Sequence, residues 1–207
     1  LPAGSGTAQT KETEFDVIFS GDGFRYAFSK RFGTFTSMQI AGREQLAEPV
    51  RLTAWRATTD NDRNIRPYWD SENIWQGENL DKTFQKVYEC QVSPGRVTVD
   101  GSLAGVSRKP FFRFRLEASV DAQGKISVVL TGDVRENVIW LPRLGFEAVL
   151  PGDDLPFRYY ACGPLESYCD LRHGSAVGMY KSTAAGEYVP YVRPQEHGNH
   201  VDGKLLM

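Results

Sequence analysis

The residues with the clearest capacity for chemistry lie together in the segment 55–63, which reads Trp-Arg-Ala-Thr-Thr-Asp-Asn-Asp-Arg. Its two aspartates, Asp60 and Asp62, could supply the carboxylate pair, about 5 Å apart, that a retaining glycosidase needs. Spaced by two residues, they would share one face of a strand. However, Arg56 and Arg63 flank them, and neighbouring arginines hold carboxylates ionised, whereas an acid catalyst needs a raised pKa. We therefore do not assign Asp60 and Asp62 as a catalytic pair.

The same segment is typical of a structural polar network. Thr, Asn and Asp side chains satisfy backbone donors in tight turns, and arginine binds a carboxylate in a fixed bidentate geometry. We expect Arg56 to pair with Asp60 or Asp62 and so to hold the turn in one shape. The alternative interpretation is that these polar side chains contact a ligand directly.

Other polar candidates lie later in the chain. The segment 196–200 reads Glu-His-Gly-Asn-His and could hold a metal ion, but a glycine-containing turn does not impose the spacing of metal ligands. A polar turn is the preferred interpretation, and no metal site is predicted. Glu166, in a Gly-Pro-Leu-Glu-Ser-Tyr turn, could bond a sugar hydroxyl or cap a neighbouring loop. The chain has no Gly-x-Ser-x-Gly nucleophile elbow.

Three segments together resemble a known family. Residues 55–62 are followed by 160–168, which read Tyr-Ala-Cys-Gly-Pro-Leu-Glu-Ser-Tyr, and by 188–199, which read Tyr-Val-Pro-Tyr-Val-Arg-Pro-Gln-Glu-His-Gly-Asn. Segments of these types stand in this order in the last domain of the large bacterial β-galactosidases of glycoside hydrolase family 2. The resemblance spans nearly the whole chain, and it implies the antiparallel supersandwich that this domain shares with galactose mutarotase.

The resemblance also implies a function. The chain is expected to be the non-catalytic C-terminal domain of a β-galactosidase that hydrolyses terminal β-D-galactosides, and to be inactive alone. The family's catalytic glutamates sit in a barrel domain, which this chain does not contain. The implied partners are that barrel, in the same protein or in a large subunit, and the β-galactoside, within an oligomeric enzyme. No cofactor is expected in this chain, although the whole enzyme is expected to use Mg²⁺ and Na⁺.

Site residues are carried over from the matching segments. The resemblance implies that the first polar segment helps shape the mouth of the active site, through Arg56, Asp60, Asn61, Asp62 and Arg63. The two later segments are expected to provide sugar or interface contacts, through Glu166, Tyr168, Glu196, His197 and Asn199.

Two other functions remain open at this point. A mutarotase-like aldose epimerase would use a histidine and a glutamate as acid and base, and His197 with Glu166 or Glu196 could serve. A stand-alone carbohydrate-binding module would need exposed aromatic side chains. Titration with galactose and lactose, together with an assay of anomer interconversion, distinguishes these functions from the galactosidase domain.

Composition excludes several other classes. The 207 residues are 41% hydrophobic and 12% aromatic, which is enough for a folded core. The net charge is −2, with 24 basic and 26 acidic residues, so the chain lacks the basic surface of a nucleic-acid or anionic-membrane binder. No apolar run is long enough to span a membrane. The three cysteines show no disulfide framework or zinc spacing. Three unpaired thiols are expected, which favours the cytoplasm, with a Cys162–Cys169 bridge as the alternative.

The rest of the chain predicts strands and turns. Residues 112–120 alternate strictly, so Phe112, Phe114, Leu116, Ala118 and Val120 should face inward. The outward face, with Arg113, Arg115 and Glu117, is either a binding face or the solvated side of an antiparallel sheet. Glycine-containing turns at 21–23 and 93–95 predict hairpins.

One short helix is predicted within residues 67–80, with Asp70 or Ser71 as its N-cap. Its two tryptophans, Trp69 and Trp75, are expected to pack onto a sheet, with a sugar platform as the alternative. The predicted fold is therefore all-β: an antiparallel supersandwich, galactose mutarotase-like, with one short helix. Residues 1–12 are expected to be a linker remnant, and residues 13–207 one β-sandwich domain that is truncated at its C-terminal end.

Overall fold

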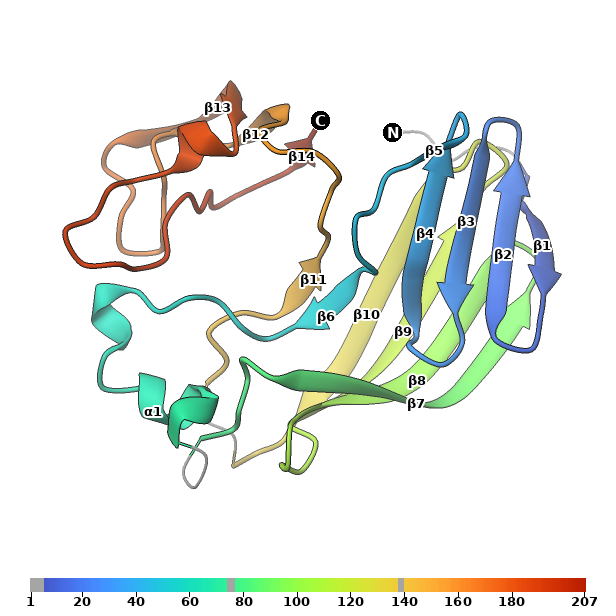
Figure 1. The fold of residues 1–207 in the computed structure, drawn as a ribbon, viewed down its shortest axis with the longest axis horizontal. Helices are drawn as coiled ribbons and strands as arrows, with labels where there is room; N and C mark the ends of the chain where they lie inside the picture. The colour runs from blue at the N-terminus through green and yellow to red at the C-terminus, as the bar shows by residue number, and fades with distance from the viewer. Residues whose placement is uncertain (1–5, 74–76, 138–139) are drawn as a thin grey trace. The chain divides into compact units, whose positions relative to one another are not determined.

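A computed structural model of the chain describes residues 6–73, 77–137 and 140–207 (Figure 1). The regular structure of the described residues is nearly all β, in antiparallel sheets, with one short α-helix, which confirms the predicted fold class. The chain divides into two compact units. Unit 1 comprises Leu1–Trp55 and Ile65–Pro151, and unit 2 comprises Arg56–Asn64 and Gly152–Met207. The expectation of one sandwich domain over residues 13–207 stays a prediction.

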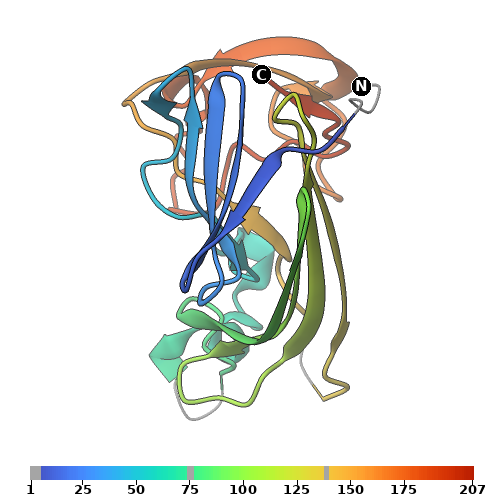
Figure 2. The same cartoon turned by 90° about the vertical axis from the view of Figure 1, so that its right-hand side faces the viewer.

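Unit 1 contains a sandwich of two antiparallel sheets (Figures 1 and 2). Side chains from both sheets, such as Phe19, Phe28, Val99 and Leu116, form one buried core. The first sheet follows chain order: β1 (Gln9–Glu12), β2 (Asp16–Gly21), β3 (Phe24–Ser29), β4 (Thr34–Ile40) and β5 (Arg43–Glu44). The second has the order β10 (Ile126–Val134), β9 (Phe112–Val120), β8 (Arg96–Gly105) and β7 (Thr83–Ser93). A separate pair joins β6 (Arg51–Thr53) to β11 (Gly145–Glu147).

Local sequence explains the hairpins and the sheet faces. Asp22 and Gly23 join β2 to β3, and Gly23 has a φ of 75°, a conformation that costs glycine little. Along β9, the side chains of Phe112, Phe114 and every second residue after them are buried, while the arginines between them are exposed. The predicted hairpin and the predicted inward face of β9 are therefore confirmed.

The start of the chain differs from the prediction. Residues 9–12 were expected to be linker, but they form β1, which pairs with β2. Just before it, Ala8 is buried, and its amide donates to the carbonyl of Val120 on β9 at 3.1 Å. The segment therefore contacts both sheets of unit 1. The polar sequence of residues 9–12 gave no strand signal, because most side chains of β1 are exposed and the strand is held by backbone hydrogen bonds.

The helix is shorter than predicted and begins earlier. α1 spans Arg66–Trp69, Ile65 is its N-cap residue, and Asp70 ends it in an extended conformation. Asp70 and Ser71 therefore do not form the N-cap of α1, but the Asp70 carboxylate accepts from the Glu72 amide at 3.2 Å, in the turn that follows, as well as from Arg66 Nε at 2.7 Å. A 3₁₀ turn, η2 (Ser71–Asn73), follows. Ile74 and Trp75 lie outside the described residues.

Trp69 packs in the core, as expected from the sequence. Its side chain is buried in the unit 1 core, and its indole Nε1 donates to the carbonyl of Trp140 at 2.9 Å. A buried indole needs such an acceptor. Trp69 therefore offers no platform to a sugar.

Unit 2 is built around a three-stranded sheet. β12 (Pro156–Pro164) lies between β13 (Ser175–Thr183) and β14 (Leu205–Leu206). Two short 3₁₀ turns complete the unit, η1 (Asp60–Asp62) and η3 (Ala185–Glu187). The candidate site residues carried over from the family resemblance all fall within this unit.

Candidate functional site

The organising contact of unit 2 is the ion pair between Arg56 and Asp62. Arg56 Nη1 donates to Asp62 Oδ2 at 2.6 Å, and Nη2 donates to Oδ1 at 3.3 Å. The two side chains are only 17% and 11% exposed. The backbone amide and the hydroxyl of Thr59 also donate to Asp62 Oδ2, at 2.7 and 2.9 Å. This arrangement confirms the predicted fork onto one of the two aspartates and identifies that aspartate as Asp62.

These contacts determine the charge of Asp62. Burial alone would raise the pKa of the Asp62 carboxyl, but the hydrogen bonds from Arg56 and Thr59 outweigh burial and lower that pKa. Burial would likewise lower the pKa of Arg56, and the bond to Asp62 raises it instead. Both groups are therefore charged at neutral pH, and Asp62 has no proton to give to a leaving group.

Asp60 lies in a different environment. Residues 60–62 form the 3₁₀ turn η1 rather than a strand, so the two aspartates do not share a strand face. Asp60 pairs with Arg63 at 2.5 Å, and their side chains are 66% and 56% exposed. Exposed pairs of this kind contribute little to stability. Asp60 and Asp62 thus have different roles, which agrees with rejecting them as a catalytic pair.

Residues of the third motif, 188–199, contact the first polar segment, 55–63. The Glu196 carboxylate lies 3.6 Å from Arg56 Nε, and the Glu196 amide donates to the carbonyl of Thr58 at 3.1 Å. The Asp60 amide donates to Gln195 Oε1 at 2.9 Å. Arg56 therefore lies between two carboxylates, Asp62 from its own turn and Glu196 from a segment far away in the sequence.

Asn61 makes a further contact, with a residue just after the middle motif. Asn61 Nδ2 donates to Asp170 Oδ2 at 2.8 Å. Asp170 follows the Gly-Pro-Leu-Glu-Ser-Tyr turn by two residues. The structure therefore joins all three segments that the sequence singled out.

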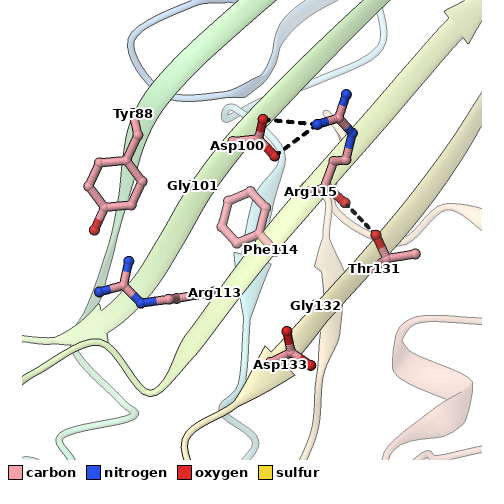
Figure 3. Close-up of a pocket in the computed structure, with 9 residues that line it drawn as sticks. All are labelled: Tyr88, Asp100, Gly101, Arg113, Phe114, Arg115, Thr131, Gly132 and Asp133. Atoms are coloured by element: carbon pink, nitrogen blue, oxygen red, sulfur yellow. Dashed lines mark hydrogen bonds and ion pairs between the residues drawn. The ribbon is translucent and has the colours of Figure 1, made fainter.

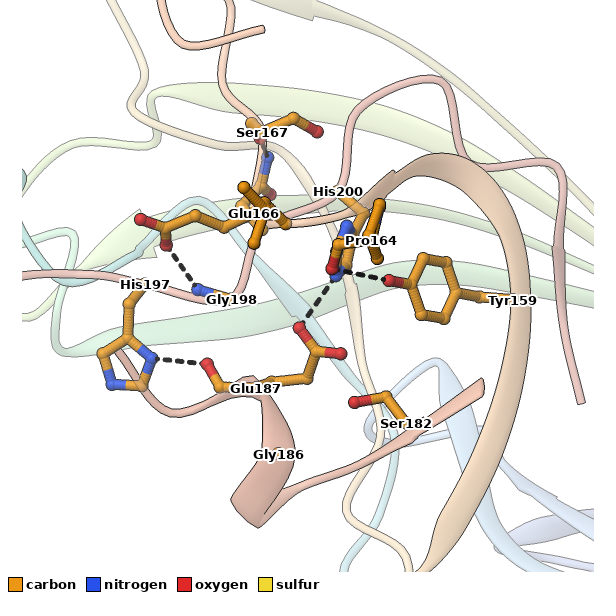
Figure 4. Close-up of polar contacts among 12 residues, drawn as sticks. Tyr159, Pro164, Glu166, Ser167, Ser182, Gly186, Glu187, His197, Gly198 and His200 are labelled. Carbon is orange, nitrogen blue, oxygen red and sulfur yellow. Dashed lines mark hydrogen bonds and ion pairs between the residues drawn. The ribbon is translucent and has the colours of Figure 1, made fainter. Parts of the chain in front are cut away.

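Glu166 caps the loop that carries the third motif (Figure 4). Its Oε2 accepts from the Gly198 amide at 2.9 Å, and its Oε1 accepts a very short hydrogen bond from the Tyr191 hydroxyl. The bond to Glu166 also raises the pKa of Tyr191. Of the two roles predicted for Glu166, loop capping is confirmed and sugar contact stays a prediction.

Tyr168 lies close to two of these carboxylates. Burial, followed by the negative charges of Glu196 and Glu166, raises the pKa of Tyr168 to about 12. Its hydroxyl is buried, and the Asn199 backbone that lies near it, and slightly opposes the rise in pKa, falls outside strict hydrogen-bond geometry in the described part of the chain. Its backbone is paired with Leu171. Tyr168 is thus a neutral phenol beneath a negatively charged cluster.

A second cluster in unit 2 was not predicted. His200 Nδ1 lies 2.8 Å from the carbonyl oxygen of Cys162, and Nε2 lies 2.8 Å from Glu187 Oε2 (Figure 4). The ring of Tyr159 packs on the imidazole, with centroids 4.3 Å apart. Glu187 sits in the turn η3, 13 residues before His200, and no local spacing relates the two. Only the fold shows this pair.

The side chains of His197 and Asn199 also contact backbone carbonyl groups. His197 Nδ1 lies 3.2 Å from the carbonyl oxygen of Glu187, and Asn199 Nδ2 donates to the carbonyl of Ser167 at 2.7 Å. The Glu166 carboxylate is already occupied by Gly198 and Tyr191. This geometry does not form the acid–base pair of His197 and Glu166 that an epimerase would need.

The described residues were searched for clusters of side chains that commonly bind metal ions. No group of three or more histidine, cysteine, aspartate or glutamate side chains converges within residues 6–73, 77–137 and 140–207. The Mg²⁺ and Na⁺ expected for a whole enzyme therefore have no site in this part of the chain. Helices long and apolar enough to cross a membrane are also absent from the described residues.

Comparison with known proteins identifies the family. The profile of the family described as "Beta galactosidase small chain" matches residues 20–206. The chain belongs to the β-galactosidase small-chain family. It is 30% identical over 204 residues to a β-galactosidase from Actinobacillus pleuropneumoniae, covering 97% of this chain and 20% of that protein.

Two further relatives agree. The chain is 34% identical over 190 residues to a β-galactosidase from Lactobacillus delbrueckii subsp. bulgaricus, covering 91% of this chain and 18% of the relative. It is 29% identical over 201 residues to a β-galactosidase from Kluyveromyces lactis, covering 92% and 19%. The small-chain domain thus spans about a fifth of the length of these relatives.

Proposed function

We propose that this chain is a non-catalytic domain of a β-galactosidase that hydrolyses terminal β-D-galactosides, and that it packs on the catalytic barrel and shapes the mouth of the active site. The family membership supports the parent activity. The lowered pKa of Asp62 supports the non-catalytic role, because a general acid needs the opposite shift. The barrel is proposed to lie in the same protein or in a large subunit of an oligomeric enzyme.

The proposed role at the mouth of the active site rests on one observation: Arg56 is held between Asp62 and Glu196. This contact ties the segment 56–64 to the third motif, and the bond from Asn61 to Asp170 ties it to the residues just after the middle motif. A segment that is held at several points within a small unit presents its remaining side chains in a defined direction. Such rigid support is what a surface that positions a substrate needs.

The test uses the full-length β-galactosidase that contains this chain. Asp62→Asn keeps the shape of the side chain but removes the charge that pairs with Arg56. We expect kcat/KM for a chromogenic β-galactoside to fall by about tenfold, because small displacements at a substrate-positioning surface are costly. The measurement is made well below the unfolding temperature of the variant, and circular dichroism verifies that the protein is folded.

Asp60→Asn is the matched control. It makes the same chemical change two residues away, at an exposed side chain. We expect kcat/KM to stay within about twofold of wild type, because exposed ion pairs contribute little. If a folded Asp62→Asn enzyme has wild-type kcat/KM, the proposed role at the active-site mouth is refuted, and the network serves only the fold.

Two further properties belong to this proposal. The Mg²⁺ and Na⁺ expected for the whole enzyme are proposed to bind outside the described residues of this chain. The free thiols of Cys90, Cys162 and Cys169 support a cytoplasmic location, because structural disulfides are typical of oxidising compartments.

A further inference from the structure

The outer face of the second sheet in unit 1 carries a polar hollow of about 610 Å³ (Figure 3). It extends over all four strands, from Tyr88 on β7 to Asp133 on β10. We define the polar hollow by its outward side chains: Tyr88, Asp100, Arg113, Arg115, Thr131 and Asp133. Neither the ion-pair network of unit 2 nor the family motifs include any of these residues.

A β-bulge places the aromatic ring in the polar hollow. The register between β7 and β8 shifts between Val87 and Glu89, so Tyr88 is the extra residue of the strand. Its side chain is 50% exposed, and its hydroxyl lies 2.8 Å from the buried Ser102 hydroxyl. Bulges redirect side chains and are common next to binding sites. Tyr88 is therefore anchored at its hydroxyl while much of the side chain stays open to solvent.

The charges of the polar hollow are balanced but only partly paired. Its two arginines and two aspartates cancel. Arg115 Nη1 binds both oxygens of Asp100, at 3.3 and 3.1 Å. Arg113 and Asp133 are cross-strand neighbours, yet no ion pair joins them within the described chain. Arg113 instead lies over the Tyr88 ring, 5.8 Å from its centroid, and Lys86 Nζ, beside the polar hollow on β7, lies 5.4 Å from the same centroid.

This combination selects a class of ligand. Asp100 and Asp133 would repel an anionic ligand, and the two arginines would repel a cationic one. A neutral sugar suits both, because each hydroxyl can donate to an aspartate and accept from an arginine. The apolar face of a pyranose ring also matches an exposed aromatic ring. We propose that the polar hollow binds a neutral saccharide, with Tyr88 stacking on the ring and Arg113 and Asp133 binding its hydroxyls.

This proposal is independent of catalysis and goes beyond the proposed function. It adopts the binding interpretation of the outer face, one of the two that the sequence left open. An ordinary solvated face needs neither a bulged tyrosine nor a hollow. The charged side chains that are not engaged in ion pairs, Arg113 and Asp133, lie within reach of the same space (Figure 3).

The test measures binding by the chain itself, without turnover. Saturation-transfer NMR and isothermal titration are carried out with galactose, lactose and β-1,4-galactotriose. We expect saturable binding that is weakened at least about tenfold by Tyr88→Ala and by Asp133→Asn, which corresponds to about 1.4 kcal/mol. Gln91→Ala is the matched control, because Gln91 is an exposed residue on the same strand outside the polar hollow. It should bind as wild type.

Several results would overturn the proposal. Absence of saturable binding by all three sugars contradicts it directly. Equal affinity of wild type, Tyr88→Ala and Asp133→Asn would place any sugar elsewhere on the chain. Competition by inorganic phosphate would show an anion site instead of a neutral one. Unfolding midpoints of each variant, measured in urea, verify that a loss of binding is not a loss of fold.

Discussion

The ion pair of Arg56 and Asp62 makes the sharpest prediction about stability. Asp62→Asn removes the carboxylate charge while Arg56 stays charged and mostly buried. Breaking a fully buried pair costs about 3–5 kcal/mol. Here both side chains retain some exposure, and Glu196 remains 3.6 Å from Arg56 Nε as a second carboxylate. We therefore expect the free energy of unfolding to fall by about 2–3 kcal/mol.

Urea unfolding of the chain at pH 7 measures this change, with the midpoint and slope determined separately. Asp60→Asn is the control and should change the free energy of unfolding by no more than about 0.5 kcal/mol, because its pair is exposed. If unit 2 unfolds separately from unit 1, the change should appear in the transition of unit 2. That transition can be followed through amide exchange of residues in β12.

The effect should depend on pH in one direction. The folded-state pKa of Asp62 is lowered, so its contribution is complete above the unfolded pKa of about 4 and is lost as the pH falls through the folded value. The difference between wild type and Asp62→Asn should be constant from about pH 5 to pH 8 and shrink below about pH 4. If Asp62→Asn and Asp60→Asn are equally stable at pH 7, the account of the network is wrong.

Three other tests, with five substitutions, address separate features. Phe114→Ala should lower the free energy of unfolding by about 3–5 kcal/mol and Arg115→Ala by no more than about 0.5 in urea, and equal losses would mean a wrong face for β9. Tyr168→Phe should be neutral or stabilising by up to about 1 kcal/mol in thermal unfolding, and a clear loss would reveal a bonded hydroxyl. Glu166→Ala should speed hydrogen exchange at the Gly198 amide, and Glu166→Gln should restore part of the protection.

Much of unit 1 follows from sequence because its determinants are local. The two-residue period of β9 assigns each side chain to a face, and Asp22-Gly23 supplies the turn that a tight hairpin needs. Where the local signal was ambiguous, prediction failed. Gln9–Glu12 is polar, yet it is a strand, because the free edge of β2 supplies backbone partners that no local pattern can show.

The sequence predicted only part of the candidate site. Arginine beside two aspartates predicted an ion pair, since the groups are close along the chain. The choice of Asp62 over Asp60 depended on the 3₁₀ turn, which buries one carboxylate and exposes the other.

Contacts between distant segments were decided by the fold alone. Glu196 reaches Arg56 across 140 residues, and Glu187 reaches His200 through a turn whose spacing carries no signal. The polar hollow likewise depends on a bulge in β7, which shifts one tyrosine relative to its neighbours on β8. Sequence specifies which groups can pair and which faces are apolar. The burial that makes a pair strong, and the register that brings side chains together, arise only when strands far apart in the chain pack against each other.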